Sequence, residues 1–529
     1  MFRRQTLVTL ILIATVGGGV PAAAEPPPGN EWRVPRAVEQ TVEIQLLDHD
    51  GAPARAYALI AYDLATGASR WLYDASGTVT AELPEGRYLL YAHVSTDRPG
   101  GSVTTHFAEP GFVVDGYTTQ VLDSRLGRPL DVRVDEPNAR EGTTTLEFLA
   151  TTPAGVAGMR SAGNTGFDDT LVAPSATTAP EFRFGVETEL AEPDGNGGFA
   201  DSPYLYHIRW GENGRVPADL ERSFPDTGLA TVLSEHAVET EGLYGVRDGM
   251  VSALLPFALT EHYTPDVPWE TRFTEAAIPN SYERSSTVSA TPRVYRAGQV
   301  TRERWNTGVF GPAFPAHEPA PENFAPYVSE RQGDRFEFRV PMFTDRDPAR
   351  MGGTGTVSGA TGTTELLRDG TVLQTSDQPG DLTATVTPDA GTYTLRTSAQ
   401  RRDFRLSTDI RTEWTFPSAH TAKAEPVPLM AVRFAPDLDL HNTAPAGRFR
   451  MPVYVQRNGS GVVGHRPSVE VSYDDGATWR ATRVLADRAG WSVLLNHPAG
   501  AEFVSLRATA SDGAGSGTTQ TILRAYAIR

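Results

Sequence analysis

Short runs of alternating apolar and polar residues, separated by turn residues, cover almost the whole chain. Val42–Leu46 alternates with period two and leads into Asp48–Gly51, and a second strand-like run, Tyr57–Tyr62, is followed by the turn Ala65–Gly67. Because side chains on a strand point alternately to opposite faces, period two indicates strands with one buried face. Strands at intervals of about 8–12 residues, with turn signals between them, predict β-sandwiches or barrels.

A strand, corner, Tyr, strand pattern occurs twice, at Pro84–Leu90 and at Pro388–Leu395. In immunoglobulin-like sandwiches a Tyr at such a corner hydrogen-bonds back to the backbone, two residues before a core position. Leu90 and Leu395 are expected to fill that core position here. We therefore predict an all-β chain of tandem β-sandwich domains, immunoglobulin-like or prealbumin-like, with a larger loop-rich β-domain in the middle.

Length and turn clusters set the expected domains. A chain of 529 residues is long enough for roughly three to five domains of about 100–200 residues, each able to bury its own core. A stretch rich in Ala, Thr, Ser and Pro, from Thr151 to Pro180, is expected to be a long loop. The predicted divisions are a signal peptide at 1–24 and β-domains at 25–138, 139–334, 335–430 and 431–529.

The first residues have the features of an export signal. Arg3 and Arg4 form a positive segment, Leu7–Val16 is a short apolar core, and Ala22–Ala24 supplies small residues for cleavage. The mature chain is then expected to start near Glu25. No later segment approaches the ~20 apolar residues that a membrane span needs, so we expect a secreted protein without a stable membrane anchor.

Composition narrows the chemistry and the partners. The sequence has no cysteine, which excludes disulfides, thiol nucleophiles and Cys-ligated zinc. Its formal net charge of −18 disfavours nucleic acid and anionic lipid as partners. Extracellular protein, peptide or glycan remain as possible partners, and the oligomeric state stays open.

Motifs of known hydrolases are incomplete. Asp226–Gly228 matches the Asp-Thr-Gly tripeptide of subtilisins and aspartic proteases, but the His-Gly-Thr and Gly-Thr-Ser-Met-Ala segments that complete a subtilisin site are missing from the sequence. None of the 11 histidines forms a His-Glu-x-x-His motif. We interpret Asp226–Gly228 as a turn and predict no catalytic residue.

Ser472–Trp479 matches the Asp-box pattern Ser-x-Asp-x-Gly-x-Thr-Trp of sialidase propeller blades. A propeller needs repeated blades, and this pattern occurs once. We therefore predict a single structural hairpin, in which Asp475 and Gly476 make the tight turn, Ser and Asp side chains tie it, and Trp479 packs over its base.

One acidic loop is a candidate metal site. Asp194, Asn196 and Asp201 offer oxygen ligands on a Gly-rich loop, as calcium prefers. The loop lacks the spacing and the bidentate Glu of an EF-hand, and an ordinary Gly/Asn turn is the competing interpretation. No other cofactor is predicted.

One aromatic stripe is a candidate binding surface. Tyr204, Tyr206 and Trp210 share one face of an alternating strand, and exposed aromatic side chains often mark surfaces that stack on sugar rings or contact a peptide. At strand spacing, such a stripe can equally be core.

Three segments, Tyr263–Trp269, Arg302–Pro312 and Leu438–Gly447, resemble the long non-catalytic region that follows the protease domain in large secreted subtilisin-like peptidases of actinobacteria. The resemblance extends over most of the mature chain. It implies a string of exported β-domains associated with a serine protease. No position here matches the Asp, His or Ser of that family's protease, so no catalytic role is implied.

These observations predict a secreted, non-catalytic binding or accessory protein. The alternative is an extracellular hydrolase, glycan-acting or metal-dependent, with a site in the middle domain that the sequence does not reveal. A pocket that gathers carboxylates or histidines favours the alternative, whereas an exposed aromatic or edge-strand surface favours the binding protein. A purely structural role, or the remnant of a protease relative, stays open as well.

Overall fold

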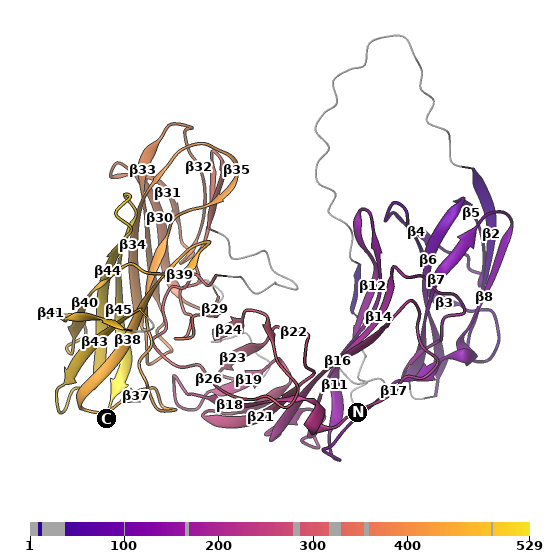
Figure 1. Cartoon of the computed structure of the whole chain (residues 1–529), viewed down its shortest axis with the longest axis horizontal. Helices are drawn as coiled ribbons and strands as arrows, with labels where there is room; N and C mark the ends of the chain where they lie inside the picture. The colour runs from indigo at the N-terminus through magenta and orange to yellow at the C-terminus, as the bar shows by residue number, and fades with distance from the viewer. Residues whose placement is uncertain are drawn as a thin grey trace, which may run out of the picture. The chain divides into compact units, whose positions relative to one another are not determined.

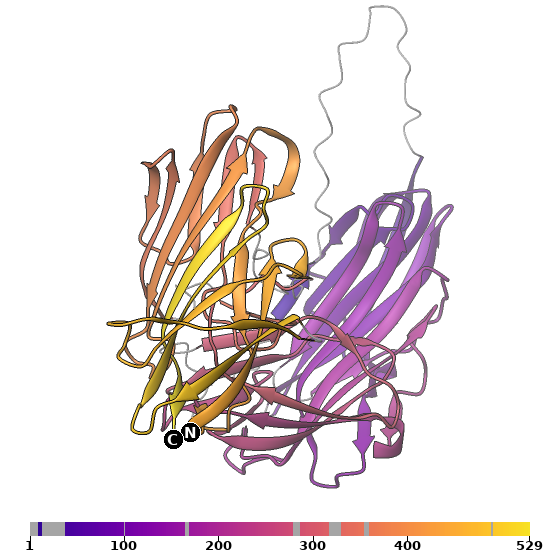
Figure 2. The same ribbon diagram turned by 60° about the vertical axis from the view of Figure 1, so that its left-hand side comes forward.

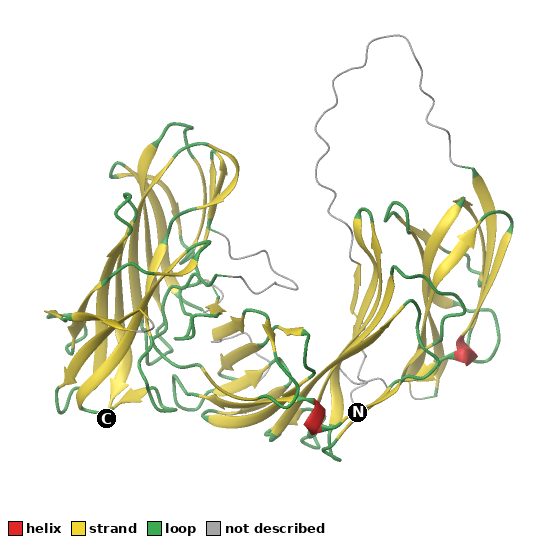
Figure 3. Cartoon of the chain, viewed as in Figure 1, coloured by secondary structure: helices red, strands yellow, loops and turns green. Residues whose placement is uncertain are grey.

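The structure, a computed structural model, is almost entirely β-strand (Figures 1 and 3). Its only helical elements among the described residues are two 3-10 turns, η1 (Ser124–Leu126) and η2 (Asp226–Gly228). The all-β prediction is confirmed. Within the described ranges, no helix is long and apolar enough to cross a membrane. The residues described are 9–12, 38–99, 101–163, 169–278, 286–316, 329–353, 359–487 and 490–529.

The chain divides into two compact units. Unit 1 consists of Met1–Glu192, Leu205–Ala230 and His262–Thr264, and unit 2 of Pro193–Tyr204, Thr231–Glu261 and Pro265–Arg529. Each unit therefore contains segments that are distant in the sequence, and each is described by itself.

Unit 1 contains a three-stranded sheet (order β5-β2-β8), a six-stranded sheet (β4-β3-β6-β7-β13-β9), the parallel pair β10-β17, and strands in the order β1-β12-β11-β14-β16. The strands are β1 (Thr9–Leu12), β2 (Glu39–Leu47), β3 (Ala56–Asp63), β4 (Ser69–Leu72), β5 (Thr78–Pro84), β6 (Gly86–Arg98), β7 (Gly101–Val114), β8 (Thr118–Asp123), β9 (Arg128–Pro129), β10 (Asp131–Val134), β11 (Arg140–Thr152), β12 (Gly155–Gly163), β13 (Thr170–Val172), β14 (Phe182–Ala191), β16 (Tyr204–Asn213) and β17 (Glu221–Phe224).

The six-stranded sheet of unit 1 is covered on both faces. Leu90 of β6 packs with Val42 and its neighbours in the core under the three-stranded sheet. The next residue, Tyr91, points to the other face and packs with Phe148 of β11. Because successive strand residues point to opposite faces, β6 reads as a continuous buried run from Tyr88 to Ala92 instead of alternating.

The segment after residue 138 shares this architecture. Strand β13 pairs in parallel with β7 of the N-terminal sandwich, and β11 contributes to the core on that sandwich's second face. The expected division between 25–138 and 139–334 therefore falls within one compact unit. The expected loop from Thr151 to Pro180 was wrong in part, because β12 and β13 lie within it. β12 pairs with β11 and β13 pairs with β7, so contacts with these strands produce β-structure in a stretch whose composition favours a loop.

Unit 2 contains sheets of six strands (β15-β20-β19-β23-β24-β29), four strands (β32-β28-β27-β35), nine strands (β31-β30-β33-β34-β45-β44-β40-β41, with β37 on β45) and five strands (β36-β38-β43-β42, with β39 on β38), besides the pair β22-β25 and strands in the order β21-β18-β26. The strands are β15 (Phe199–Ala200), β18 (Ala230–His236), β19 (Tyr244–Arg247), β20 (Val251–Leu254), β21 (Phe257–Tyr263), β22 (Pro268–Trp269), β23 (Arg272–Ala276), β24 (Ser286–Ala290), β25 (Arg293–Val294), β26 (Val300–Trp305), β27 (Glu330–Gly333), β28 (Arg335–Arg339), β29 (Arg350–Gly352), β30 (Thr361–Arg368), β31 (Thr371–Ser376), β32 (Asp381–Thr385), β33 (Gly391–Gln400), β34 (Asp409–Ser418), β35 (Thr421–Pro426), β36 (Met430–Phe434), β37 (Thr443–Ala444), β38 (Gly447–Arg457), β39 (Gly461–Val463), β40 (Ser468–Ser472), β41 (Arg480–Ala481), β42 (Val484–Asp487), β43 (Gly490–His497), β44 (Phe503–Ser511) and β45 (Gly517–Ile528).

The two C-terminal segments, 335–430 and 431–529, share one sheet. Strand β34 pairs with β45 over seven residues, from Asp409 opposite Leu523 to Thr415 opposite Gly517. Their buried side chains also form one core, in which Trp414 lies together with residues of β38 and β44. In Figure 2 these orange and yellow strands run side by side. The boundary predicted between residues 430 and 431 therefore divides segments that contribute to the same sheet. The sequence did not indicate this, because pairing between strands a hundred residues apart has no local signal.

The two predicted tyrosine corners differ. The hydroxyl of Tyr88 donates to the carbonyl oxygen of Pro84 at 2.8 Å, and Leu90 is fully buried, as predicted. Tyr393 is buried beside Phe416, but its hydroxyl makes no hydrogen bond to any residue that the structure describes. The second corner therefore has the predicted core leucine, Leu395, without the hydrogen bond back to the backbone.

The expected signal segment, 1–24, lies outside the described residues except for Thr9–Leu12. These four residues form β1, antiparallel to β12. Export through a cleaved signal stays a prediction.

Candidate functional site

The N-terminal sandwich exposes aromatic side chains at one edge of its six-stranded sheet. Strand β4 is the edge strand and pairs with β3 on one side. Trp71 on β4 is 55% exposed, and Tyr73, just after the strand, is 67% exposed. Leu72 between them is buried in the core. Edge position and large exposed rings together mark a surface suited to binding.

Local contacts hold this aromatic edge in place. The ring of Tyr57 on β3 stacks on Tyr73 with a centroid distance of 5.3 Å. The Tyr57 hydroxyl donates to the carbonyl oxygen of Asp74 at 2.7 Å and accepts from the Asp74 backbone N–H at 2.8 Å. Hydrogen bonds from Ser76 lower the pKa of Asp74 and fix the turn beyond β4. We call Tyr57, Trp71 and Tyr73 the aromatic edge.

The predicted aromatic stripe on β16 takes part in packing. Tyr204 is 6% exposed and Tyr206 is fully buried. Trp210 is half-buried, lies edge-on to Phe184 at 5.7 Å, and has the guanidinium of Arg222 4.5 Å from its ring centroid. These contacts agree with the core alternative, and a binding role for the three residues stays a prediction.

The Asp-Thr-Gly tripeptide forms a turn, as predicted. Asp226 opens η2 after Pro225. Its carboxylate accepts a hydrogen bond from the hydroxyl of Tyr206 at 2.8 Å and lies 3.9 Å from Nδ1 of His262, whose ring stacks on Tyr206 at 4.5 Å. Burial and the bond to Asp226 raise the pKa of Tyr206. The carboxylate thus positions a buried tyrosine within unit 1.

The predicted calcium loop is closed by its own aspartate. The carboxylate of Asp194 accepts hydrogen bonds from the backbone N–H of Asn196 at 2.7 Å and of Gly198 at 3.0 Å. These bonds lower the pKa of Asp194. The backbone N–H of Asp201 donates to the carbonyl oxygen of Ser252 at 2.8 Å. The arrangement is that of a turn, and calcium binding by Asp194, Asn196 and Asp201 stays a prediction.

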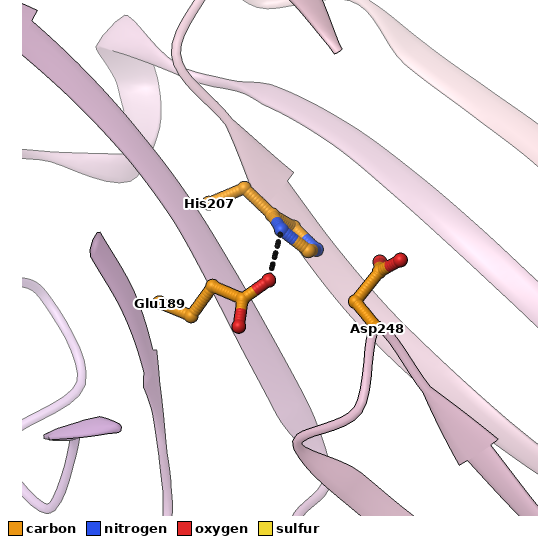
Figure 4. A group of neighbouring side chains, drawn as sticks. All are labelled: Glu189, His207 and Asp248. Carbon is orange, nitrogen blue, oxygen red and sulfur yellow. Dashed lines mark ion pairs between the residues drawn. The ribbon is translucent and has the colours of Figure 1, made fainter. Parts of the chain in front are cut away.

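Glu189 of β14 and His207 of β16 lie opposite each other in unit 1. Nδ1 of His207 is 3.5 Å from the Glu189 carboxylate, as the dashed line in Figure 4 marks. The third residue labelled there, Asp248, belongs to unit 2, where it pairs with Arg247 at 3.2 Å and accepts a hydrogen bond from the backbone N–H of Arg272. Within unit 1 the pair offers two ligand groups, fewer than the three protein ligands of a catalytic zinc site. We assign no metal to it.

The Asp-box segment forms the predicted hairpin between β40 and β41. Ser472 Oγ donates to Asp474 at 2.7 Å, and the Asp474 carboxylate accepts from the Thr478 backbone N–H at 2.9 Å. The aspartate that ties the turn is therefore Asp474. Asp475 adopts a positive φ of 53° and pairs with Arg524. The motif acts here as a structural hairpin.

Replacing Asp474 with Ala is expected to lower the thermal unfolding midpoint. Hydrogen bonds from Ser472 and Thr478 lower the pKa of Asp474 to about 2. Because the folded-state pKa lies below the unfolded value, this stabilisation is present above about pH 4 and is lost as the pH falls towards 2. Calorimetry should show the difference between wild type and variant shrinking over that range. Asp437→Ala, at a side chain 93% exposed, is the control, and a pH-independent difference would contradict the assignment.

Two carboxylates with raised pKa values are enclosed in unit 2. Burial raises the pKa of Glu239 to about 8 and that of Glu275 to about 7. Glu239 pairs with Arg401, and Glu275 accepts from the side-chain amide of Asn306 at 2.7 Å. All four side chains are buried, so the cluster holds segments of unit 2 together and offers no open face to a substrate.

Comparison with known proteins finds neither a matching family model nor a matching curated protein. The resemblance to the region that follows the protease domain of subtilisin-like peptidases therefore stays a prediction.

The aromatic edge was not predicted from the sequence. Its signal is an aromatic, apolar, aromatic triplet, Trp71 to Tyr73, in a short strand-like run between the turns Ala65–Gly67 and Asp74–Gly77. Successive side chains of such a run point to opposite faces, and here Leu72 points to the core while Trp71 and Tyr73 are exposed.

Proposed function

We propose that this chain is an exported, non-catalytic binding or accessory protein that contacts its partner through the aromatic edge of the N-terminal sandwich. The exposure of Trp71 and Tyr73 beside the side of β4 that pairs with no other described strand is the observation that carries the proposal. Large aromatic rings supply contact area at low conformational cost, and an edge strand offers backbone donors and acceptors to a partner.

The polar surroundings of the aromatic edge fit a binding role. Ser69 and Arg70 of β4 are exposed, and Arg70 donates to the backbone carbonyl of Glu82, which keeps the strand end ordered. Tyr57 and Tyr73 are already stacked, so less rotamer freedom is lost when a partner binds. The partner is an extracellular protein, peptide or glycan.

The test is capture from culture medium and binding to a glycan array, with the purified chain immobilised through a tag. The double variant Trp71→Ala/Tyr73→Ala is expected to weaken capture by about tenfold or more. Tyr117→Ala removes an equally exposed tyrosine, 67%, outside the aromatic edge and should leave capture unchanged.

Two results would contradict the proposal. Equal capture by the double variant and the wild type would exclude the aromatic edge as the binding surface. Turnover of a captured peptide or glycan by the purified chain would contradict a non-catalytic binding function and would support the alternative, a hydrolase.

A further inference from the structure

Unit 2 has a pocket of about 650 Å³ where the start of β44 and the end of β45 meet neighbouring loops. Its volume lies within the roughly 300–1,000 Å³ typical of small-molecule sites. The lining is mostly apolar, and Phe503 and Ile528 are its largest apolar side chains. Its charged lining residues are Arg405, Glu502 and Arg529.

Most charges around this pocket have partners of opposite sign. Arg529 pairs with Asp439 at 2.8 Å. Arg524, whose guanidinium lies 4.8 Å from the Phe503 ring centroid, pairs with Asp475 at 2.8 Å. The hydrogen bond to Asp475 and the nearby charge of Glu502 raise the pKa of Arg524, so Glu502 also faces a cation.

Arg405 is different. Its side chain is half-buried, and its guanidinium lies 5.5 Å from the Phe503 ring centroid. Among the ion pairs of the described residues, none includes Arg405. Its backbone N–H donates to Thr240 Oγ1 at 3.0 Å, which fixes the loop that presents it. The pocket therefore combines an apolar wall with a guanidinium that forms no ion pair among the described residues, and its three charged lining residues, Arg405, Glu502 and Arg529, sum to one positive charge.

We propose that this pocket binds a carboxylate carried on an apolar body, with Arg405 pairing with the carboxylate and Phe503 packing against the body. A guanidinium matches the geometry of a carboxylate through two parallel N–H donors. In a half-buried position this ion pair is less screened by water than one on the open surface. The site lies apart in the sequence from the aromatic edge and does not depend on the function proposed above.

The test uses two probes of one shape, N-acetyl-phenylalanine and its carboxamide, titrated against the full chain and followed by ligand-observed NMR. The acid is expected to bind at least tenfold more tightly than the amide, because a charge-assisted hydrogen bond is replaced by a neutral one. Arg405→Met should reduce the affinity for the acid to that for the amide and leave the amide unaffected.

Arg402→Met is the matched control, since Arg402 is an exposed arginine in the same loop that does not line the pocket. It should leave the acid's affinity unchanged. Thermal unfolding midpoints of both variants establish that they are folded. The proposal is overturned if neither probe binds, if acid and amide bind equally to the wild type, or if Arg405→Met keeps the preference for the acid.

Discussion

Replacing Arg401 with Met is expected to lower the free energy of unfolding by about 3–5 kcal/mol at about pH 8, because the substitution leaves buried carboxylates without their cation. The side chains of Arg401 and Glu239 are both fully buried and pair directly. The guanidinium also lies 4.0 Å from the ring centroid of Phe343 and 4.2 Å from that of Phe404. Methionine keeps much of the packing volume and removes the charge.

The second carboxylate makes this loss depend on pH. Glu275 also senses the charge of Arg401, and its Oε1 accepts from the backbone N–H of Glu239 at 3.1 Å. Burial raises the pKa of Glu239 to about 8 and that of Glu275 to about 7, from an ordinary 4.5. Between the ordinary pKa of 4.5 and the raised values of about 7 and 8, the folded state therefore binds more protons than the unfolded state. Stability from this source is present below the unfolded pKa and is lost as the pH rises through 7 to 8.

Urea denaturation at about pH 5 and about pH 8 checks both statements. At the lower pH the carboxylates are protonated, so the loss caused by Arg401→Met should be clearly smaller than at the higher pH. Arg396→Met is the matched control, because Arg396 and Glu413 form an exposed pair, and its cost should stay within about 0.5 kcal/mol. Equal losses for Arg401→Met at both pH values would show that packing alone is responsible.

The Arg401 cluster also shows which features the sequence could not predict. Arg401 and Glu239 are 162 residues apart, and each follows a strand in a turn-rich stretch, where a charged residue is normally solvated. Val42–Leu46 and the Asp-box hairpin were predictable because their patterns are complete within a few residues. Tyr88 and Tyr393 share a local pattern, but only Tyr88 hydrogen-bonds back to the backbone.

Binding surfaces were predicted less well than strands, for a related reason. Tyr206 and Trp71 are both aromatic residues in strand-like runs. Tyr206 lies in the buried run from Tyr204 to Ile208, whereas β4 lies at a sheet edge. Alternation along a strand shows that two faces exist, but which face is covered depends on the sheets that pack there.

Trp305 is a further residue whose role depends on distant segments. In the sequence it is an isolated aromatic among turn residues. In the structure it ends β26, is fully buried, and has two guanidiniums close to its ring. The distances from its ring centroid are 3.5 Å to Arg350 and 4.4 Å to Arg247. Arg350 in turn pairs with the buried Asp345 at 2.7 Å.

Replacing Trp305 with Leu is expected to lower the free energy of unfolding by about 3–5 kcal/mol, because it creates a cavity and removes the ring face that the two cations contact. Trp305→Phe keeps a ring face and should cost less, by about 1–2 kcal/mol. Trp414 is the comparison site: it is equally buried, and its indole N–H donates to the carbonyl oxygen of Met430 at 2.6 Å.

Arginine stacks on Trp305 but not on Trp414 among the cation–ring contacts of the described residues. Both Phe and Leu remove the indole N–H of Trp414, so the two substitutions should differ less at Trp414 than at Trp305. Urea denaturation of the four variants gives the free-energy difference between the Phe and Leu variants at each site. Comparing this difference between the two sites cancels much of the cavity cost that they share. The idea is contradicted if the Phe and Leu variants differ in free energy of unfolding by no more at Trp305 than at Trp414. In that case the aromatic ring of Trp305 would stabilise the fold only by filling space and not by contacting the two arginines.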